Sequence, residues 1–286
     1  MYFQKVLLVL KYEDKKALLL GQEIKSFLES YGLEVEIFSN SLLGTTIQID
    51  LPRVDLIIVI GGDGTFLSAM RKINLPAVPF LGFNLGRLGF MAELEIENWK
   101  KDLERILRGE FKLSKRLELQ YKVLPEGEEG LAINDVVLHR TGLARLLEIK
   151  IKIGDEEEFV VRADGVIIFT PTGSTAYNFS AGGPILMPEI QAFGLNFICP
   201  FLYPVPSFVV PETSKLKITL ASSQVETMLT IDGQRGINFD SEQELAIEAS
   251  ERRFLIVQKP QSGLISKFKV KGILNDRPVP FSFKSL

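Results

Sequence analysis

Residues 54–65 read VDLIIVIGGDGT, an apolar run that ends in a glycine-rich loop with a carboxylate, Asp63, at its centre. A strand that ends in glycines and opens a helix commonly binds phosphate, because the N–H groups of the loop and of the first helical turn point toward the anion. Asp63 would repel that anion unless it faced a hydroxyl group or a metal ion beside the phosphates. The stretch therefore predicts a phosphate site that also needs a base or a counter-charge.

The segments around this loop alternate between two patterns. Strand candidates occur at 4–10, 33–38, 54–60 and 78–84, and the first of them looks like a buried strand. Helices are predicted between and after these strands at 14–31, 66–73 and 98–107. Strands that alternate with helices favour a doubly wound, mainly parallel sheet, so we expect an α/β domain over residues 1–111. In such sheets ligands bind at the carboxyl ends of the strands, where GGDGT and the later NLGRLGF both fall.

Between Lys112 and Lys259 the apolar residues recur at every second position, as in half-buried strands. These alternating residues are Leu117, Leu119, Tyr121 and Val123, then Leu147, Ile149, Ile151 and Ile153, then Leu216, Ile218 and Leu220. Turn sequences such as GDEEE at 154–158 and DGQRG at 232–236 join the runs. We therefore expect antiparallel hairpins in an all-β, sandwich-like domain over 112–259. Residues 260–286 form a C-terminal segment that we expect to return to the first domain.

Composition and charge exclude several classes of partner. The chain has 286 residues, of which 46% are apolar and 24% are charged, and its formal net charge is −3. This balance supplies no basic surface for a nucleic-acid backbone. The sequence also has no basic run of the kind that binds an anionic membrane. The N-terminal apolar stretch between Lys5 and Lys11 is too short for a spanning helix and poor as a signal peptide. We expect no nucleic acid, no membrane and a cytoplasmic location.

The rarest residue types narrow the chemistry further. A single cysteine, Cys199, cannot form an intrachain disulfide, and a single histidine, His139, cannot build a His/Cys zinc site. Any metal would therefore have oxygen ligands, which suit Mg²⁺. A Ser-His-Asp hydrolase would have to use His139, which shares a face with Asp135 and Val137 if this run is a strand. A structural or surface role for His139 is the better interpretation.

Two glycine motifs and an arginine have both a functional and a structural interpretation. Asp63 and Thr65 in GGDGT can also serve a tight turn or cap the next helix. GFNLGRLGF at 82–90 places glycines after another strand, where they let a ligand approach the backbone or simply make turns. Arg71 lies one or two helical turns past the first loop, where it could reach a phosphate, although such an arginine is more often solvated.

The stretch DGVIIFTPTGSTAYNFSAGGPI at 164–185 is less ordinary, because a strand is followed by a dense set of hydroxyls. Ser and Thr both donate and accept hydrogen bonds, as the edge of an adenine or the hydroxyls of a ribose require, and Tyr177 could pack against a base. The alternative is a chain of Ser/Thr turns, which would need neither the tyrosine nor the leading carboxylate. A nucleophilic Ser174 is disfavoured, because no base accompanies it.

GGDGT, NLGRLGF, AINDVVLHR and DGVIIFTPTGSTAYNFSAGGPI, in this order and spacing, resemble an NAD kinase over roughly residues 1–240. GGDGT alone is shared with diacylglycerol, sphingosine and phosphofructokinase-type kinases, whereas TPTGSTAY with its leading Asp-Gly is more particular to NAD kinases. The resemblance implies phosphoryl transfer from ATP, or from polyphosphate, to the 2′-hydroxyl of the adenosine ribose of NAD, giving NADP. It also implies a divalent cation such as Mg²⁺ and a homo-oligomer, usually a dimer or tetramer.

The resemblance also gives the residues roles. Asp63 would take the proton from the 2′-hydroxyl, which explains a carboxylate inside a phosphate loop. The residues expected to face the phosphates of the donor are Gly61, Gly62, Gly64, Thr65 and Arg71. Those expected to bind NAD are Asn84, Asn134, Asp135, Asp164, Thr175, Ala176, Tyr177 and Ser180. Asp164 matches an acid that is sometimes presented across a subunit interface, and no residue is assigned to the metal.

The chain departs from the family in two places. Where many members carry Cys-Pro-His, it reads CPFLYPVPS from residue 199, so any contact from that histidine is lost. Its last 27 residues do not resemble the usual ending. Two alternatives stay open at this point: a lipid kinase that shares GGDGT, which would phosphorylate lipid, and a non-catalytic regulator, which would bind NAD and leave it unchanged.

Overall fold

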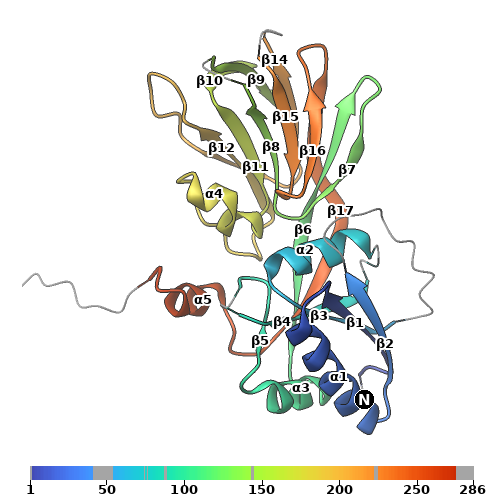
Figure 1. The fold of residues 1–286 in the computed structure, drawn as a ribbon. Helices are drawn as coiled ribbons and strands as arrows, with labels where there is room; N and C mark the ends of the chain where they lie inside the picture. The colour runs from blue at the N-terminus through green and yellow to red at the C-terminus, as the bar shows by residue number, and fades with distance from the viewer. Residues whose placement is uncertain are drawn as a thin grey trace, which may run out of the picture.

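The N-terminal part is a parallel sheet with helices on both faces (Figure 1). The computed structural model describes residues 2–40, 54–73, 75, 77–86, 89–142, 145–221 and 225–274. The elements of this part are β1 (Lys5–Lys11), α1 (Lys15–Ser30), β2 (Glu34–Asn40), β3 (Leu56–Ile60), α2 (Asp63–Lys72), β4 (Pro79–Asn84), β5 (Leu94–Glu95) and α3 (Trp99–Leu107). Their strands pair in parallel in the order β2-β1-β3-β4, with β5 beside β4. The predicted doubly wound α/β fold is confirmed.

The central strands of this sheet are apolar at nearly every position, so both faces must be covered. Different helices cover the two faces. Leu8 and Leu10 of β1 pack with α1 and α3 in one core cluster. Leu7 and Val9 point to the opposite face and pack with α2. A strand covered on both faces carries a continuous apolar run rather than an alternating one, which is the pattern of residues 56–60.

Helix α2 begins at Asp63, three residues before the predicted start at Phe66. Gly62 precedes the helix in an extended conformation, and the Phe66 N–H donates to the Gly62 carbonyl, so residues 63–66 form the first helical turn. The prediction left these residues in the loop because glycine has a low helix propensity. Asp63 therefore lies at the positive end of the helix dipole.

Most of the rest of the described chain forms two antiparallel layers of strands that pack face to face, and one of these layers continues the N-terminal sheet. One sheet contains, in spatial order, β13 (Phe208–Pro211), β12 (Ala192–Ile198), β11 (Gly165–Phe169), β8 (Asp135–Arg140), β15 (Thr227–Ile231) and β16 (Arg235–Phe239). The facing strands are β10 (Phe159–Ala163), β9 (Leu147–Ile153), β14 (Lys215–Leu220), β17 (Glu244–Gln258), β6 (Lys112–Leu124) and β7 (Glu129–Ala132). Leu119 and Ile149 of one sheet meet Leu138 and Ile168 of the other in a single core. The predicted sandwich is confirmed, with hairpins β9–β10 and β15–β16 at the two predicted turns.

One sheet runs through both parts of the molecule, because β6 and β17 are long enough to reach from one to the other (Figure 1). In the α/β part, β17 pairs in parallel with β4, and Leu255 lies opposite Pro79. The register between β17 and β6 shifts between Ala249 and Arg253. The predicted domain division at residue 111 falls immediately before β6. This shared sheet fixes the carboxyl ends of β3 and β4 relative to the sandwich.

After β17 the described part of the chain forms one short helix, α5 (Leu264–Val270), in which Lys267 and Phe268 are buried. The Lys267 ammonium donates to the carbonyls of Phe90 and Ala92, so α5 packs against the loop that leads to β5. Residues 275–286 of the C-terminal segment, and residues 87–88 of NLGRLGF, lie outside the described residues. None of the helices that the structure describes is long and apolar enough to cross a membrane.

Candidate active site

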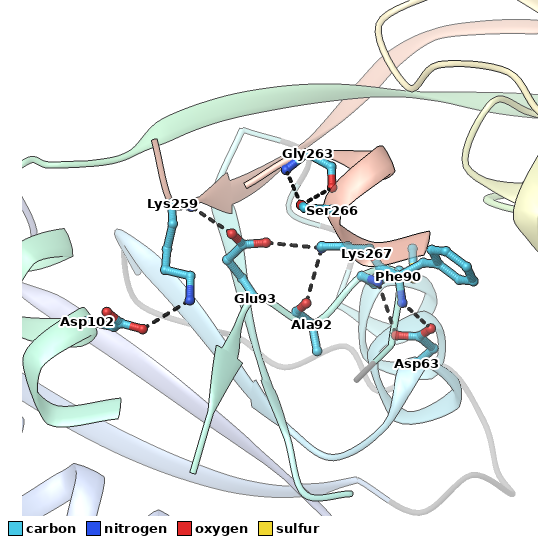
Figure 2. Close-up of polar contacts among 10 residues, drawn as sticks. Asp63, Phe90, Ala92, Glu93, Asp102, Lys259, Gly263, Ser266 and Lys267 are labelled. Atoms are coloured by element: carbon cyan, nitrogen blue, oxygen red, sulfur yellow. Dashed lines mark hydrogen bonds and ion pairs between the residues drawn. The ribbon is translucent and has the colours of Figure 1, made fainter. Parts of the chain in front are cut away.

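The loop that follows β4 holds the carboxylate of Asp63 (Figure 2). Asp63 Oδ2 accepts a hydrogen bond from the Phe90 N–H at 2.8 Å, and Oδ1 accepts one from the Met91 N–H at 3.1 Å. The position of Asp63 in the first turn of α2 favours its negative charge. Each carboxylate oxygen keeps a further lone pair. The side chain is therefore fixed in direction and still able to accept a proton.

Two glycines permit this arrangement. A Cβ at Gly61 would lie 2.6 Å from Thr65 Oγ1, so a larger residue would block the turn from β3 into α2. A Cβ at Gly89 would overlap the Asp63 carboxylate, so glycine lets the second loop come close enough for its amides to donate. Gly62 has no atom within 4 Å of that position. The two predicted glycine loops thus meet at Asp63.

Arg71 faces the sandwich rather than solvent. Its Nη2 donates to Gln234 Oε1 at 2.7 Å, and Gln234 Nε2 donates in turn to the Gly64 carbonyl at 3.1 Å. Gln234 belongs to the turn between β15 and β16, so this turn is attached to the first helical turn of α2. Gly64 and Arg71, both predicted to face the phosphates of the phosphoryl donor, are therefore linked to each other by hydrogen bonds through Gln234.

A cavity of about 330 Å³ opens beside the end of β8. Four of the residues predicted to bind NAD line it, namely Asn134, Asp135, Ala176 and Tyr177. The other lining residues are Val137, His139, Thr230, Asp232 and Gly233. Tyr177 is 46% exposed, so its ring forms an open wall of the cavity. The volume is in the range of small-molecule sites.

Two buried carboxylates, those of Asp135 and Asp232, lie in this cavity. Asp232 accepts hydrogen bonds from the N–H groups of Ile133, Asn134 and Asp135, the shortest at 2.7 Å from Asn134. Burial and the nearby Asp232 raise the pKa of Asp135 to about 7. Burial also raises the pKa of Asp232, although the three amides favour its charged form. Asp135 therefore changes protonation near neutral pH, beside predicted NAD contacts.

Three hydroxyls of the segment after β11 bond the backbone around them rather than facing the cavity. Each hydroxyl donates to a backbone carbonyl: Thr170 to that of Ile133, Ser174 to that of Pro171, and Thr175 to that of Thr172. The Ser/Thr-turn interpretation therefore explains these hydroxyls. Thr175 also lines a separate cavity of about 20 Å³, which has room for a water molecule only. Ala176 and Tyr177 are the members of the segment that line the larger cavity.

Besides Thr175, three more of the residues predicted to bind NAD are not among those that line this larger cavity. Asn84 bonds its own loop, donating to the Gly86 carbonyl at 3.1 Å and accepting from the Gly86 N–H at 3.3 Å. Asp164 accepts from Arg140 Nε at 2.6 Å. Ser180 is exposed at the end of α4 (Tyr177–Ser180). The structure of the single chain does not bring these three side chains together with Asn134 and its neighbours.

Comparison with known proteins places this geometry in a family. The sequence pattern of the ATP-NAD kinase N-terminal domain matches residues 25–111, and that of the ATP-NAD kinase C-terminal domain matches residues 133–259. The NAD kinase of Nitratidesulfovibrio vulgaris (strain DSM 19637 / Miyazaki F) is 34% identical over 275 residues, which make up 95% of this chain and 97% of that protein. The chain belongs to the NAD kinase family.

Other NAD kinases show a similar extent of likeness. The NAD kinase of Magnetococcus marinus is 33% identical over 266 residues, 88% of each chain. The crystal structure of an NAD kinase from Archaeoglobus fulgidus in complex with ATP has a TM-score of 0.75 at 25% identity and covers 93% of this chain and 99% of that one. The fold also matches yeast NADH kinase complexed with NADH, with a TM-score of 0.83 at 24% identity over 98% of this chain and 90% of that one. Neither a lipid kinase nor a non-catalytic regulator gains support.

The NAD kinase fold also brings in residues that sequence reasoning did not single out. Asp232 and Gln234 belong to DGQRG, which by itself signals only a hairpin turn. Glu93 and Lys267 form a buried ion pair of 3.0 Å behind the loop that holds Asp63. A lysine in a short helix near the end of a chain normally indicates a solvated surface. In the fold, Lys267 is instead buried, and its ammonium bonds the Phe90 and Ala92 carbonyls.

Proposed function

We propose that this NAD kinase transfers the γ-phosphoryl group of ATP to the 2′-hydroxyl of the adenosine ribose of NAD, giving NADP and ADP. Likeness to NAD kinases over 95% of the chain supports NAD as a substrate, and the ATP complex of the Archaeoglobus fulgidus protein supports ATP. One observation carries the proposed chemistry. A carboxylate, Asp63, begins the helix after a glycine loop and is held by two amides of a second loop.

Asp63 is the general base in this proposal. A free lone pair of its carboxylate accepts the 2′-hydroxyl proton while the hydroxyl oxygen bonds to the γ-phosphorus and the bond from that phosphorus to the ADP oxygen breaks. The N–H groups of Phe90 and Met91 keep the carboxylate directed at the hydroxyl. The N–H groups at the start of α2 face the phosphates of the donor and stabilise their charge.

A divalent cation such as Mg²⁺ fits this site as a companion of the donor phosphates. Among the described residues there is no group of three or more His, Cys, Asp or Glu side chains that could hold a metal alone. Mg²⁺ usually binds one or two carboxylates together with substrate phosphates and water, and Asp63 is the carboxylate beside the predicted phosphate loop. When bound, the cation would offset the charge of the phosphates.

The cavity beside β8 is the proposed site for the adenosine end of NAD. The half-exposed ring of Tyr177 offers a face on which a base can stack. Asn134 supplies an amide that donates and accepts, and Asp135 supplies a carboxyl group that does either, according to pH. Contacts of NAD with Asn84, Thr175 and Ser180 stay predictions from the family resemblance.

The proposed active form is a homo-oligomer, either a dimer or a tetramer. Asp164 lies outside the cavity of its own chain, which suits an acid that acts across a subunit interface. Three exposed apolar side chains, Phe201, Leu202 and Tyr203, follow one another after β12. A contiguous exposed apolar patch is typical of a protein interface. Light scattering of the purified chain measures the state directly, and a fully active monomer would contradict this part of the proposal.

The test of the proposed function incubates the purified chain with Mg²⁺, NAD and either ATP or polyphosphate, and measures NADP. We expect NADP with ATP, and NADP with polyphosphate would extend the range of donors. Diacylglycerol and sphingosine, offered as acceptors, should not react. Binding of NAD without any NADP would contradict the proposal. The same assay with NADH as acceptor shows whether the reduced dinucleotide is accepted, and with NADPH added it shows any feedback inhibition. Cytoplasmic location stays a prediction from sequence.

A further inference from the structure

The buried ammonium of Lys267 lies directly behind the loop that holds Asp63 (Figure 2). Lys267 Nζ donates to the Phe90 carbonyl at 2.8 Å and to the Ala92 carbonyl at 3.2 Å, and it lies 3.0 Å from Glu93 Oε2. Two hydrogens of the ammonium bond the Phe90 and Ala92 carbonyls, and Glu93 supplies the opposite charge as an ion pair. All three partners belong to residues 90–93, so the Lys267 ammonium binds this short loop.

One peptide unit connects Lys267 with Asp63. The carbonyl of Phe90 and the N–H of Met91 are the two polar groups of the peptide between these residues. Lys267 binds the carbonyl oxygen, and Asp63 Oδ1 accepts the N–H at 3.1 Å. This peptide is trans, since the single cis bond in the described chain is Leu124–Pro125. In a trans unit the two groups point in opposite directions, so a planar bridge runs from the ammonium to the carboxylate.

We propose that Lys267 is a positioning residue for Asp63, acting through the Phe90–Met91 peptide. This inference rests on the proposed function, in which Asp63 is the base. With both edges of the peptide bound, its plane cannot rotate, and the N–H that orients Asp63 keeps its direction. The ammonium also polarises the carbonyl, which strengthens the hydrogen bond at the other edge of the same unit.

Two further contacts explain why the ammonium stays in place. Glu93 is 3% exposed, and its other oxygen accepts the Lys259 N–H at 2.9 Å, so the carboxylate facing Lys267 is itself fixed. Phe268, the next residue of α5, is buried against the ring of Phe90, with centroids 5.2 Å apart. The Phe268 ring also lies 6.1 Å from that of Phe179 in α4. Helix α5 therefore packs against the loop of the base and against the segment of Tyr177.

The first experiment compares Lys267→Met with a matched control. Methionine keeps the apolar stem and removes the ammonium. We expect kcat for NADP formation to fall about 10- to 100-fold, the scale of a displaced catalytic group, with the KM for NAD within about twofold. Lys259→Met breaks an ion pair of similar length but greater exposure, 3.1 Å to Asp102, on the far side of Glu93, and should leave kcat within about twofold, the small effect expected of a partly exposed pair. An equal loss of kcat in both variants would overturn the proposal.

Removing the ammonium leaves Glu93 buried without its partner, so Lys267→Met itself could fail to fold. The double variant Lys267→Met/Glu93→Gln removes both charges and keeps an oxygen for the Lys259 N–H. It should fold, shown by its circular dichroism and melting temperature, and should show the same loss of kcat. A folded double variant with wild-type kcat would overturn the positioning role.

A second experiment separates positioning from general loosening. In an Asp63→Asn background the base is absent, so Lys267→Met should change the residual kcat by less than about twofold, whereas a structural role predicts the same factor in both backgrounds. The amide resonances of Phe90 and Met91, in protein labelled with ¹⁵N at Phe and Met, should move in Lys267→Met and stay in Lys259→Met. These resonances do not depend on activity. A wild-type chain that makes no NADP would overturn the proposed function, and unmoved resonances would overturn the positioning role.

Discussion

The two halves of the proposed site are built in different ways. In the α/β half a single side chain, Asp63, carries the chemistry, and backbone amides of a neighbouring loop hold it. In the sandwich half several side chains share the wall of an open cavity, and Tyr177 is nearly half exposed. A reacting group must keep its position to within about an ångström, whereas binding can be spread over many contacts. Changes in the first half should therefore act on kcat, and changes in the second half on KM.

Replacing the base should have the largest effect on kcat. Asp63→Asn keeps the shape of the side chain and removes its ability to take the proton. General-base catalysis is worth about 10²–10⁴ in rate, so kcat should fall by that factor while NAD binding and the melting temperature stay close to wild type. Steady-state kinetics and calorimetric NAD binding measure the two effects. A variant with more than about half of the wild-type kcat would rule out this role for Asp63, given that scale.

The next largest effect concerns the space around the base. Gly89→Ala places a methyl group where the Asp63 carboxylate lies, so the acid must move, and kcat should fall by about 10²-fold with little change in KM. Gly86→Ala is the matched control in the same loop, because no atom lies within 4 Å of the position of its added carbon. Equal kinetics for both variants would show that the close approach of the loop is irrelevant to catalysis.

The first loop could be predicted from the sequence because its signal is local. Within 54–65 an apolar strand, the glycines and Asp63 follow one another, and strand and helix patterns nearby indicated the parallel sheet. The groups that hold Asp63 could not be predicted in this way. The Phe90 N–H is 27 residues from Asp63, and Lys267 is 177 residues from Phe90. The first contact depends on the pairing of β3 with β4, and the second on the pairing of β17 with β4, neither of which a short pattern specifies.

The hydroxyl-rich segment shows the opposite case, in which a strong local pattern had two physical explanations. The density of Ser and Thr after β11 predicted ligand contacts, yet the hydroxyls of Thr170, Ser174 and Thr175 bond to backbone carbonyls. Tyr177 and Ala176 reach the cavity from the same segment. Side-chain types alone do not show which of several adjacent polar groups turn toward the backbone.

A buried acid in the sandwich half should make stability depend on pH. The pKa of Asp135 is raised to about 7, so the folded chain keeps a proton that the unfolded chain loses between about pH 4 and 7. The stability of the wild type therefore falls as pH rises through this window. Asp135→Asn cannot titrate, so its stability relative to wild type should rise across the window and level off above pH 7, with a total gain of about 4 kcal/mol for a shift of about three pKa units.

Denaturant unfolding of both chains at pH 5, 6.5 and 8 measures this difference. Titrating groups that do not interact with Asp135 contribute equally in the two proteins, so their contributions cancel. A difference that is constant over this range would show that Asp135 is already ionised at pH 5, and the account of its burial beside Asp232 would be wrong.

The smallest expected effect is on binding alone. Tyr177→Ala removes a stacking surface but no reacting group, so the KM for NAD should rise about tenfold while kcat stays within about twofold. Tyr177→Phe keeps the ring and should behave like the wild type. Should kcat fall steeply in the alanine variant with KM unchanged, the division of labour between the two halves would fail.

The most direct test of the central claim, that Asp63 acts on the 2′-hydroxyl, uses 2′-deoxy-NAD. The analogue lacks the proposed nucleophile and one hydrogen-bond partner, a loss of about 1–3 kcal/mol in binding, while its adenine and pyrophosphate keep their contacts. We predict that mass spectrometry after incubation with ATP and Mg²⁺ will find no phosphate on the analogue, and that it will inhibit NADP formation weakly and competitively against NAD. Phosphate transferred to 2′-deoxy-NAD would place the acceptor elsewhere on the dinucleotide and contradict the role of Asp63.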